Sequence, residues 1–277
     1  MPTYLYPAPS PLSESGQAAY AVINDPLLKK RYADDKRFVL VKDGASCLQD
    51  LAQYHRQQLK CPFLAIAGSN GKTTIKELLS AVLSYSFKVF ATAGNLNNHL
   101  GVPLSLLSIG TDCGFAILEI GANHLGETRF LAEIIQPDFG LVTNCGKDHL
   151  GEYGSVENII RANQELYDYL AENNRRAFVS GNDETLMRIS SHCKKRYLYG
   201  GHQPIRTRIV NSPFLGVEMR FTKDLIQTIQ SNLFGKFWED TLLGAAALGY
   251  YFGVSPLAIQ EAIESYQPAA LRSQLVE

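Results

Sequence analysis

The chain carries almost no net charge and has no long apolar run, and each shortage excludes a class of protein. Its 26 Lys and Arg residues nearly balance 27 Asp and Glu residues, for a net charge of -1. This balance gives no reason to expect nucleic acid or an anionic membrane as a partner. No apolar run approaches the roughly 18 residues of a membrane helix, and residues 1–16 lack the basic and then apolar pattern of a signal peptide. We expect a protein without a membrane segment.

Cysteine is also scarce. Five cysteines are scattered along the chain, and none belongs to a Cys-x-x-Cys pair. An odd, scattered set suits neither a disulfide framework nor a zinc site, so we predict reduced thiols and a cytoplasmic location. With 277 residues, 45% of them hydrophobic, the chain has material for one large domain or two.

A glycine-rich turn between a strand and a helix is the feature around which the rest is organised. Residues 63–67 are all apolar and predict a buried strand, and apolar residues recur at helical spacing after Lys72. Backbone N–H groups at such a helix start face an anion, a lysine adds a point charge, and a threonine hydroxyl can hold Mg²⁺. An ordinary strand-to-helix turn with a solvated lysine is the alternative. The residues predicted to bind a phosphorylated cofactor are Gly68, Ser69, Asn70, Gly71, Lys72, Thr73 and Thr74.

Polar side chains also follow the next two expected strands, residues 115–121 and 137–144. Glu119 interrupts the first strand, and a metal ion or cation should lie beside it, because an unpaired carboxylate in a buried strand is costly. The second strand ends at Asn144, and His149 follows in the next loop. Parallel α/β sheets bind ligands at the carboxyl ends of their strands. We predict that four side chains converge at this carboxyl edge of the sheet, which we call the rim: Lys72, Thr73, Glu119 and His149.

The remaining patterns predict an α/β fold, namely a P-loop type, mostly parallel sheet flanked by helices, with a small α/β N-terminal piece. We expect that piece at residues 1–59 and a central domain at 60–277. The Asn- and Gly-rich loop 93–103 is either part of the site or ordinary turn chemistry. Alternating residues from 214 to 233 predict an antiparallel hairpin at the edge of the sheet. Further strands are expected at 19–23, 38–41, 87–92, 176–180 and 196–199, and helices at 27–32, 46–59, 156–172, 239–252 and 255–266.

Four ordered stretches together resemble the ATP-binding central domain of the Mur ligases. They are residues 67–74 (AGSNGKTT), 94–103 (GNLNNHLGVP), 118–124 (LEIGANH) and 143–150 (TNCGKDHL). The glycine spacing is shorter than that of general phosphate loops, because position 66 is Ile, and this disfavours a generic ATPase or kinase. Within the family, the chain is most similar to the ligases that join D-alanyl-D-alanine to UDP-N-acetylmuramoyl-tripeptide in peptidoglycan synthesis.

The resemblance implies an ATP-dependent amide ligase that uses Mg²⁺. The tripeptide carboxylate would take the γ-phosphate of ATP to give an acyl phosphate, and the amine of D-alanyl-D-alanine would then displace phosphate. Lys72 would bind the β- and γ-phosphates, and Thr73 would coordinate Mg²⁺ together with Glu119 and His149. Lys72, Glu119 and His149 are thus the implied catalytic residues, and Asn144 would shape the cofactor site. The residues implied near the nucleotide–sugar substrate are Asn95, Asn97 and Asn98.

Three positions depart from the family pattern. Asn163 stands where the family has a lysine that becomes carbamoylated and supports a second Mg²⁺, and Trp238 and Thr241 stand where an asparagine pair contacts adenine. Compared with the family, the N-terminal substrate domain is shortened, and the sequence stops before a C-terminal domain that would close over ATP. We therefore expect no full turnover by this chain alone. A non-catalytic paralogue that binds Mg-nucleotide is the alternative function.

Overall fold

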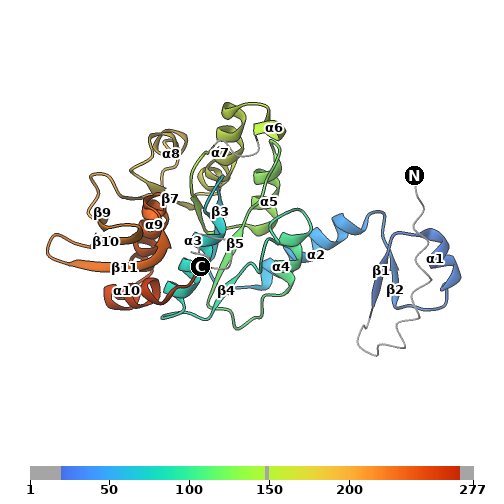
Figure 1. Cartoon of the computed structure of the whole chain (residues 1–277). Coiled ribbons are helices and arrows are strands. Elements are labelled where there is room, and N and C mark those ends of the chain that lie inside the picture. Colours follow the sequence, from blue (N-terminus) through green and yellow to red (C-terminus); the bar gives the residue numbers. More distant parts are fainter. Residues whose placement is uncertain (1–19, 147–149, 269–277) are drawn as a thin grey trace. The chain divides into compact units, whose positions relative to one another are not determined.

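The computed structural model of the chain describes residues 20–146 and 150–268 (Figure 1). Contacts divide the protein into two units, Met1–Leu51 and Ala52–Glu277, and the division falls within helix α2 (Gly44–Gln58). The predicted domain boundary after residue 59 stays a prediction. His149, which the resemblance makes a catalytic and metal-binding residue, lies outside the described residues.

The first unit contains a small α/β element of the kind predicted for the N-terminal piece. Strands β1 (Ala21–Ile23) and β2 (Phe38–Leu40) pair in parallel, and α1 (Pro26–Arg31) connects them. Asp25 caps this helix, because its carboxylate accepts a hydrogen bond from the N–H of Leu27 at 2.8 Å. The cap fixes where the first strand turns into the helix.

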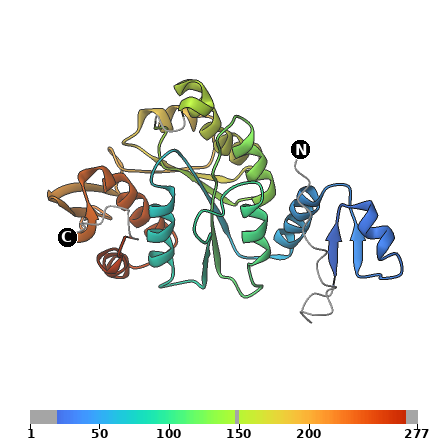
Figure 2. The same ribbon diagram turned by 45° about the vertical axis from the view of Figure 1, so that its right-hand side comes forward.

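A six-stranded parallel sheet forms the centre of the second unit (Figures 1 and 2), which confirms the predicted fold class. Its strands are β3 (Phe63–Ala67), β4 (Val89–Ala91), β5 (Phe115–Glu119), β6 (Phe139–Val142), β7 (Arg176–Ser180) and β8 (Arg196–Tyr199). They lie in the order β4-β5-β3-β6-β7-β8, and every neighbouring pair is parallel. The strand before the glycine turn, β3, is therefore flanked by β5 and β6, and the carboxyl ends of all three meet at one edge.

Alternate residues of the central strand face two separate cores. Leu64 and Ile66 belong to one core, and Phe63 and Ala65 belong to the other. Successive side chains of a strand point to opposite faces, so a strand covered on both sides reads as one continuous apolar run. Helices α3 (Lys72–Leu83), α9 (Glu239–Tyr251) and α10 (Pro256–Ser265) supply the first core, and α4 (Gly101–Leu107), α5 (Glu127–Ile135) and α7 (Val156–Glu172) supply the second.

The antiparallel strands form a sheet of their own, so the prediction of a hairpin at the edge of the main sheet is wrong. Strand β10 (Phe214–Arg220) pairs with β11 (Ile226–Phe234), as a hairpin requires, and also with β9 (Arg206–Asn211), which the sequence analysis missed. Alternating hydrophobicity specifies one buried face but not the sheet to which a strand belongs. Here the apolar face, with Val217 and Ile229, packs into the core shared with α9 and α10.

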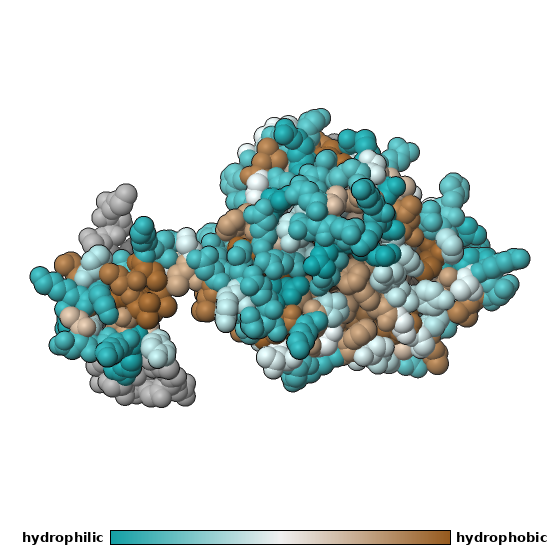
Figure 3. Space-filling model, turned by 180° about the vertical axis from the view of Figure 1, so that it is seen from behind, coloured by the Kyte–Doolittle hydropathy of each residue, from teal (hydrophilic) through white to brown (hydrophobic). Residues whose placement is uncertain are grey.

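Several short helices also escaped the sequence analysis, because fewer than three turns show little periodicity. They are α4, α5, α6 (Leu150–Tyr153) and α8 (Glu184–Ile189). Over the part of the chain that the structure describes, none of the helices is both long and apolar enough to cross a membrane. The face of the second unit seen in Figure 3 is mainly hydrophilic, with small, separate apolar patches.

Candidate functional site

Two glycines shape the turn between β3 and α3. Gly68 has a φ of +123°, and a Cβ built there would lie 2.8 Å from the backbone nitrogen of Thr143. Gly71 has a φ of +78° and precedes the first residue of α3, with Trp238 and Thr241 beside it. Glycine adopts such angles without the strain that a side chain would cause. The turn therefore lets the loop after β6 approach closely, and no side chain of the described residues caps α3.

The phosphate loop, which we define as residues 68–71, is fastened to the loop after β6. The Ser69 N–H donates to the carbonyl of Asn144 at 3.0 Å, and the Ser69 hydroxyl donates to the carbonyl of Gly146 at 3.3 Å. The side chain of Asn144 accepts from the Asn70 N–H at 3.2 Å and donates to the Asn70 carbonyl at 3.0 Å. Asn144, predicted to shape the site, thus holds the phosphate loop through both the oxygen and the nitrogen of its side-chain amide.

Lys72 lies over the phosphate loop. Its ammonium group donates to the carbonyls of Gly68 and Ser69, at 2.6 and 2.9 Å. The start of a helix carries a partial positive charge, so the lysine and the helix together give the loop a positive potential. Thr74, also predicted to bind the cofactor, is instead only 3% exposed as a whole residue. The structure therefore buries it within the first turn of α3.

Glu119 joins three segments that are far apart in the sequence. Its Oε2 accepts a hydrogen bond from the Thr73 hydroxyl at 3.0 Å, and its Oε1 accepts one from the Asn97 side-chain amide at 2.9 Å. The carboxylate side chain is only 3% exposed. Of the four side chains predicted to converge, the structure therefore brings Thr73 and Glu119 together. It adds Asn97 from the Asn- and Gly-rich loop 93–103, which we call the polar loop.

The cation that the buried carboxylate requires is Lys76, which the sequence analysis missed. Its Nζ lies 3.2 Å from Oε2 of Glu119 and donates to the carbonyl of Gly94 at 3.0 Å. Both side chains of the pair are 3% exposed, so neither charge is compensated by water. The sequence feature that could have identified Lys76 is its position one helical turn after Lys72, on the side of α3 that also carries buried Ile75.

The three asparagines predicted near the substrate have different roles in the structure. Asn97 is tied to Glu119 by its side chain and to the N–H of Gly121 by its carbonyl, at 2.8 Å. The side-chain oxygen of Asn98 accepts from the N–H of Gly101 at 2.8 Å and so holds the start of α4. Asn95 is exposed. Only Asn97 therefore contacts the carboxylate at the rim.

A small cavity of about 20 Å³ lies beside the phosphate loop, with Lys72, Tyr153 and Asn163 among its lining residues. This space holds about one water molecule. Asn163 is buried, and its side-chain nitrogen donates to the carbonyl of Ile159 at 2.9 Å. Burial raises the pKa of Tyr153 to about 12, so the phenol is neutral at physiological pH. Asn163 thus lines the cavity beside the phosphate loop and offers a neutral amide there.

A larger pocket of about 420 Å³ opens on another side of the phosphate loop. The short helix η1 (Lys236–Trp238) and the start of α9 line it with Phe237, Trp238 and Thr241. The rings of Phe237 and Trp238 lie 5.1 Å apart, and Phe237 is 71% exposed. An aromatic wall next to a phosphate loop suits a planar base on a phosphorylated ligand.

The rim residues fit a magnesium ion with a phosphate group. Thr73 and Glu119 offer two oxygen atoms 3.0 Å apart, and Mg²⁺ is commonly bound by one or two protein oxygens together with phosphates and waters. The Thr143 hydroxyl, buried beside Gly68, has no hydrogen-bond partner in the described residues. Among residues 20–146 and 150–268, no three His, Cys, Asp or Glu side chains cluster into a dedicated metal cage. The geometry therefore suits a metal that arrives with the nucleotide.

Comparison with known proteins identifies the family of the chain. The family model described as the Mur ligase middle domain matches residues 66–249. A UDP-N-acetylmuramoyl-tripeptide–D-alanyl-D-alanine ligase from Bacillus subtilis is 31% identical over 240 residues, which cover 86% of this chain and 52% of that protein. The ligase of the same name from Escherichia coli is 38% identical over 135 residues, covering 49% of this chain and 30% of that protein.

Solved structures give the same result. A crystal structure of MurF from Acinetobacter baumannii superposes with a TM-score of 0.83 at 29% identity, over 93% of this chain and 56% of that one. A MurF ligase from Thermotoga maritima in complex with ADP shares the fold, with a TM-score of 0.74 at 23% identity, over 90% of this chain and 57% of that one. The chain spans about half the length of these proteins.

Proposed function

The chain belongs to the Mur ligase family, and on this premise we propose that it is the ATP-binding part of an amide ligase that adds D-alanyl-D-alanine to UDP-N-acetylmuramoyl-tripeptide. The observation that carries the proposal is the joint contact of Thr73 and Asn97 with Glu119, because it connects the helix of the phosphate loop, the central sheet and the polar loop. Phosphoryl transfer depends mainly on such positioning and on charge neutralisation. The five free cysteines suit the reducing cytoplasm, where we assign this step of peptidoglycan synthesis.

The phosphate loop and Lys72 bind the β- and γ-phosphates of ATP in this proposal. The open N–H groups at the start of α3 face the anion, and the ammonium of Lys72 moves from the loop carbonyls to the phosphate oxygens. Asn144 keeps the loop in shape through its paired bonds to Asn70. The base enters the pocket beside Trp238 and Thr241.

Thr73 and Glu119 would hold Mg²⁺, with His149 as a further ligand. When bound, the ion would neutralise the repulsion between the phosphate and the approaching carboxylate. Lys76 keeps the Glu119 carboxylate in place through their buried ion pair. Thr73, by donating its hydroxyl to Glu119, fixes the spacing of the two oxygen ligands.

The peptide substrate meets the phosphate at the polar loop. Its terminal carboxylate takes the γ-phosphoryl group, which leaves ADP and gives an acyl phosphate. The amine nitrogen of D-alanyl-D-alanine then bonds to the acyl carbon and gives up a proton to the solvent, and phosphate leaves with the electrons of the bond that breaks. Asn97 orients the loop against Glu119, and the neighbouring Asn95 and Asn98 contact the nucleotide–sugar part of the substrate.

A non-catalytic Mg-nucleotide-binding paralogue is the second candidate, and Asn163 is the observation that favours it. This amide lies in the cavity beside Lys72, at the position where the resemblance places a carbamoylated lysine. Asparagine cannot carry that carboxylate, so the support for a second Mg²⁺ is lost. The two candidates differ in chemistry and agree on nucleotide binding.

An assay of ADP formation separates them. The chain, supplied with the C-terminal domain that the resemblance places over ATP, is incubated with ATP and Mg²⁺, with and without UDP-N-acetylmuramoyl-tripeptide and D-alanyl-D-alanine, beside an Asn163→Lys variant of the same assembly. A ligase forms ADP and the ligated peptide only when the peptide substrates are present, and the variant reacts faster. Nucleotide binding without ADP formation by either protein would overturn the ligase proposal in favour of the paralogue. Rapid hydrolysis without peptide would instead indicate an ATPase.

A further inference from the structure

A further pocket, lined mainly by basic residues, lies at the opposite edge of the parallel sheet from the phosphate loop. Its volume is about 450 Å³, which is within the range of small-molecule sites. The pocket is lined at the amino ends of β3, β6, β7 and β8, and we call it the amino-edge pocket. Its charged lining residues are Lys60, Asp138, Arg175, Arg176 and Lys195.

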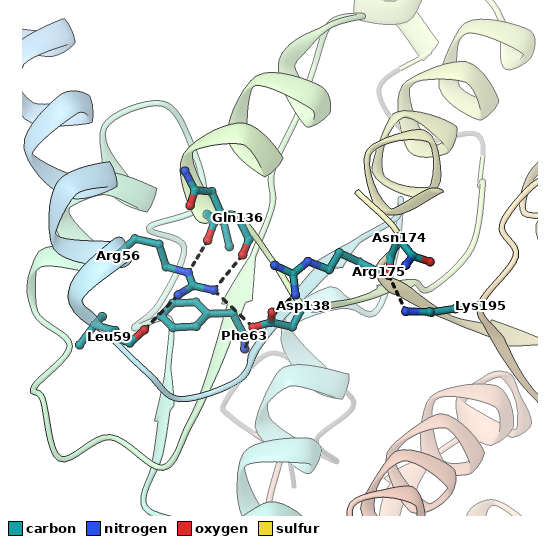
Figure 4. A network of polar contacts seen from close by, with 9 residues as sticks. Arg56, Leu59, Phe63, Gln136, Asp138, Asn174, Arg175 and Lys195 are labelled. Carbon is teal, nitrogen blue, oxygen red and sulfur yellow. Dashed lines mark hydrogen bonds and ion pairs between the residues drawn. The ribbon is translucent and has the colours of Figure 1, made fainter. Parts of the chain in front are cut away.

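Four cations thus face one carboxylate in a chain whose net charge is -1. The carboxylate is already engaged, because Asp138 accepts from Arg175 at 2.6 Å and from Arg56 at 3.3 Å (Figure 4). Within the described residues, no ion pair joins Lys60, Arg176 or Lys195 to a carboxylate. The pocket therefore keeps about three positive charges that the protein itself does not neutralise.

The fold holds these cations in defined positions. Lys195 donates to the carbonyl of Asn174 at 3.0 Å, and the guanidinium of Arg176 lies 5.4 Å from the centre of the Tyr251 ring. Asn174 has a positive φ of 53°, a conformation in which a non-glycine residue is uncommon. Arg176 begins β7, and Lys195 directly precedes the neighbouring strand β8, so the pairing of these strands brings both residues to the lining of one pocket. An anion bound there would offset the repulsion between the two positive charges.

We propose that the amino-edge pocket binds a small anion that carries two phosphate groups. Each phosphate monoester has about 1.5 to 2 negative charges at neutral pH, so two phosphates balance the unneutralised cations. Arg175 and Arg176 supply guanidinium forks, which match phosphate oxygens. Asp138 orients Arg175 without entering a bond with the ligand. This site is separate from the ATP site at the carboxyl edge.

Titration calorimetry with inorganic pyrophosphate, in buffer without Mg²⁺, tests the proposal on the whole chain. The Lys60→Gln/Lys195→Gln variant removes two cations from the pocket. The Lys30→Gln/Lys223→Gln variant removes two exposed cations elsewhere and has the same net charge. A Lys72→Ala chain removes the lysine of the phosphate loop, and thermal unfolding of each variant confirms that it is folded.

We expect saturable binding that the pocket variant weakens at least about tenfold, while the charge-matched variant binds like the original chain. The Lys72→Ala chain keeps this binding. Equal weakening in both double variants would show that only overall charge matters and would overturn the proposal. Loss of all binding in Lys72→Ala, or no saturable binding by the original chain, would overturn it as well.

Discussion

At the scale of single residues, the clearest feature of the site is a buried carboxylate that forms an ion pair with a buried lysine. Glu119 and Lys76 are both 3% exposed and lie 3.2 Å apart. Removing one member of a buried pair leaves the other charge buried without an opposite charge beside it, which is far more costly than losing an exposed pair. The same chain offers an exposed pair for comparison, Lys88 with Asp112, whose side chains are 68% and 69% exposed.

Lys76→Met should lower the free energy of unfolding by about 3–5 kcal/mol, because Glu119 is left unpaired. Urea denaturation at pH 7 measures this change. Lys88→Met is the matched control and should cost about 0–1 kcal/mol. The double variant Lys76→Met/Glu119→Gln should lose less than the sum of its two single changes, since both charges are then gone. Equal, small losses for Lys76→Met and Lys88→Met would show that the buried pair is not important to stability.

At the scale of elements, the turn between β3 and α3 depends on a backbone conformation that only glycine adopts easily. At Gly68 the positive φ coincides with close approach of Thr143 from the loop after β6. By contrast, a Cβ built at Gly44, in α2, would meet nothing within 4 Å. Comparing alanine substitutions at these two glycines therefore distinguishes a position that requires a positive φ from a position that only lacks a side chain.

Gly68→Ala should destabilise the protein by about 2–5 kcal/mol, the sum of backbone strain and a clash with Thr143. Gly44→Ala should change stability by less than about 1 kcal/mol, because Ala is the better helix former. Thermal or urea unfolding of both variants provides the comparison. A Gly68→Ala protein as stable as Gly44→Ala would contradict the described geometry of the phosphate loop.

Helices and strands with a clear pattern of apolar and polar residues were predictable from the sequence, and those with a weak pattern were not. The apolar run of β3 and the polar residues after β5 and β6 indicated a parallel sheet with a site at its carboxyl edge. The short helices α4 and α8 and the strand β9 gave too few repeats to show a period. The sequence predicted that a metal ion or a cation would lie beside Glu119. Which residue supplies the positive charge depends on tertiary contacts, and it is Lys76. The base pocket at Trp238 likewise depends on where α9 packs.

At the scale of the whole molecule, thiols that are partly or fully shielded from water make stability depend on pH. All five cysteines are free, as predicted. Burial raises the pKa of Cys145 from 9.0 to about 12 and that of Cys193 from 9.0 to about 11. The unfolded chain therefore releases these protons at lower pH than the folded chain does. The stability that they contribute is complete below about pH 9 and is lost as pH rises toward 11 to 12.

The free energy of unfolding should consequently fall more steeply between pH 9 and 10.5 in the original chain than in a Cys145→Ala/Cys193→Ala variant. Each thiol contributes up to about 1.4 kcal/mol per pH unit in that interval. Urea denaturation at a series of pH values measures both slopes. Identical slopes would mean that these thiols are not shielded from water in the folded protein.

The central claim is that the carboxyl edge of the sheet binds Mg-nucleotide through the phosphate loop. Titration calorimetry with a non-hydrolysable ATP analogue and Mg²⁺ tests it directly, with Lys72→Ala beside the original chain and Lys223→Ala as the exposed-lysine control. We expect micromolar binding by the original chain and by Lys223→Ala, and at least about tenfold weaker binding by Lys72→Ala. Equal binding by all three proteins, or none by the original chain, would contradict the claim.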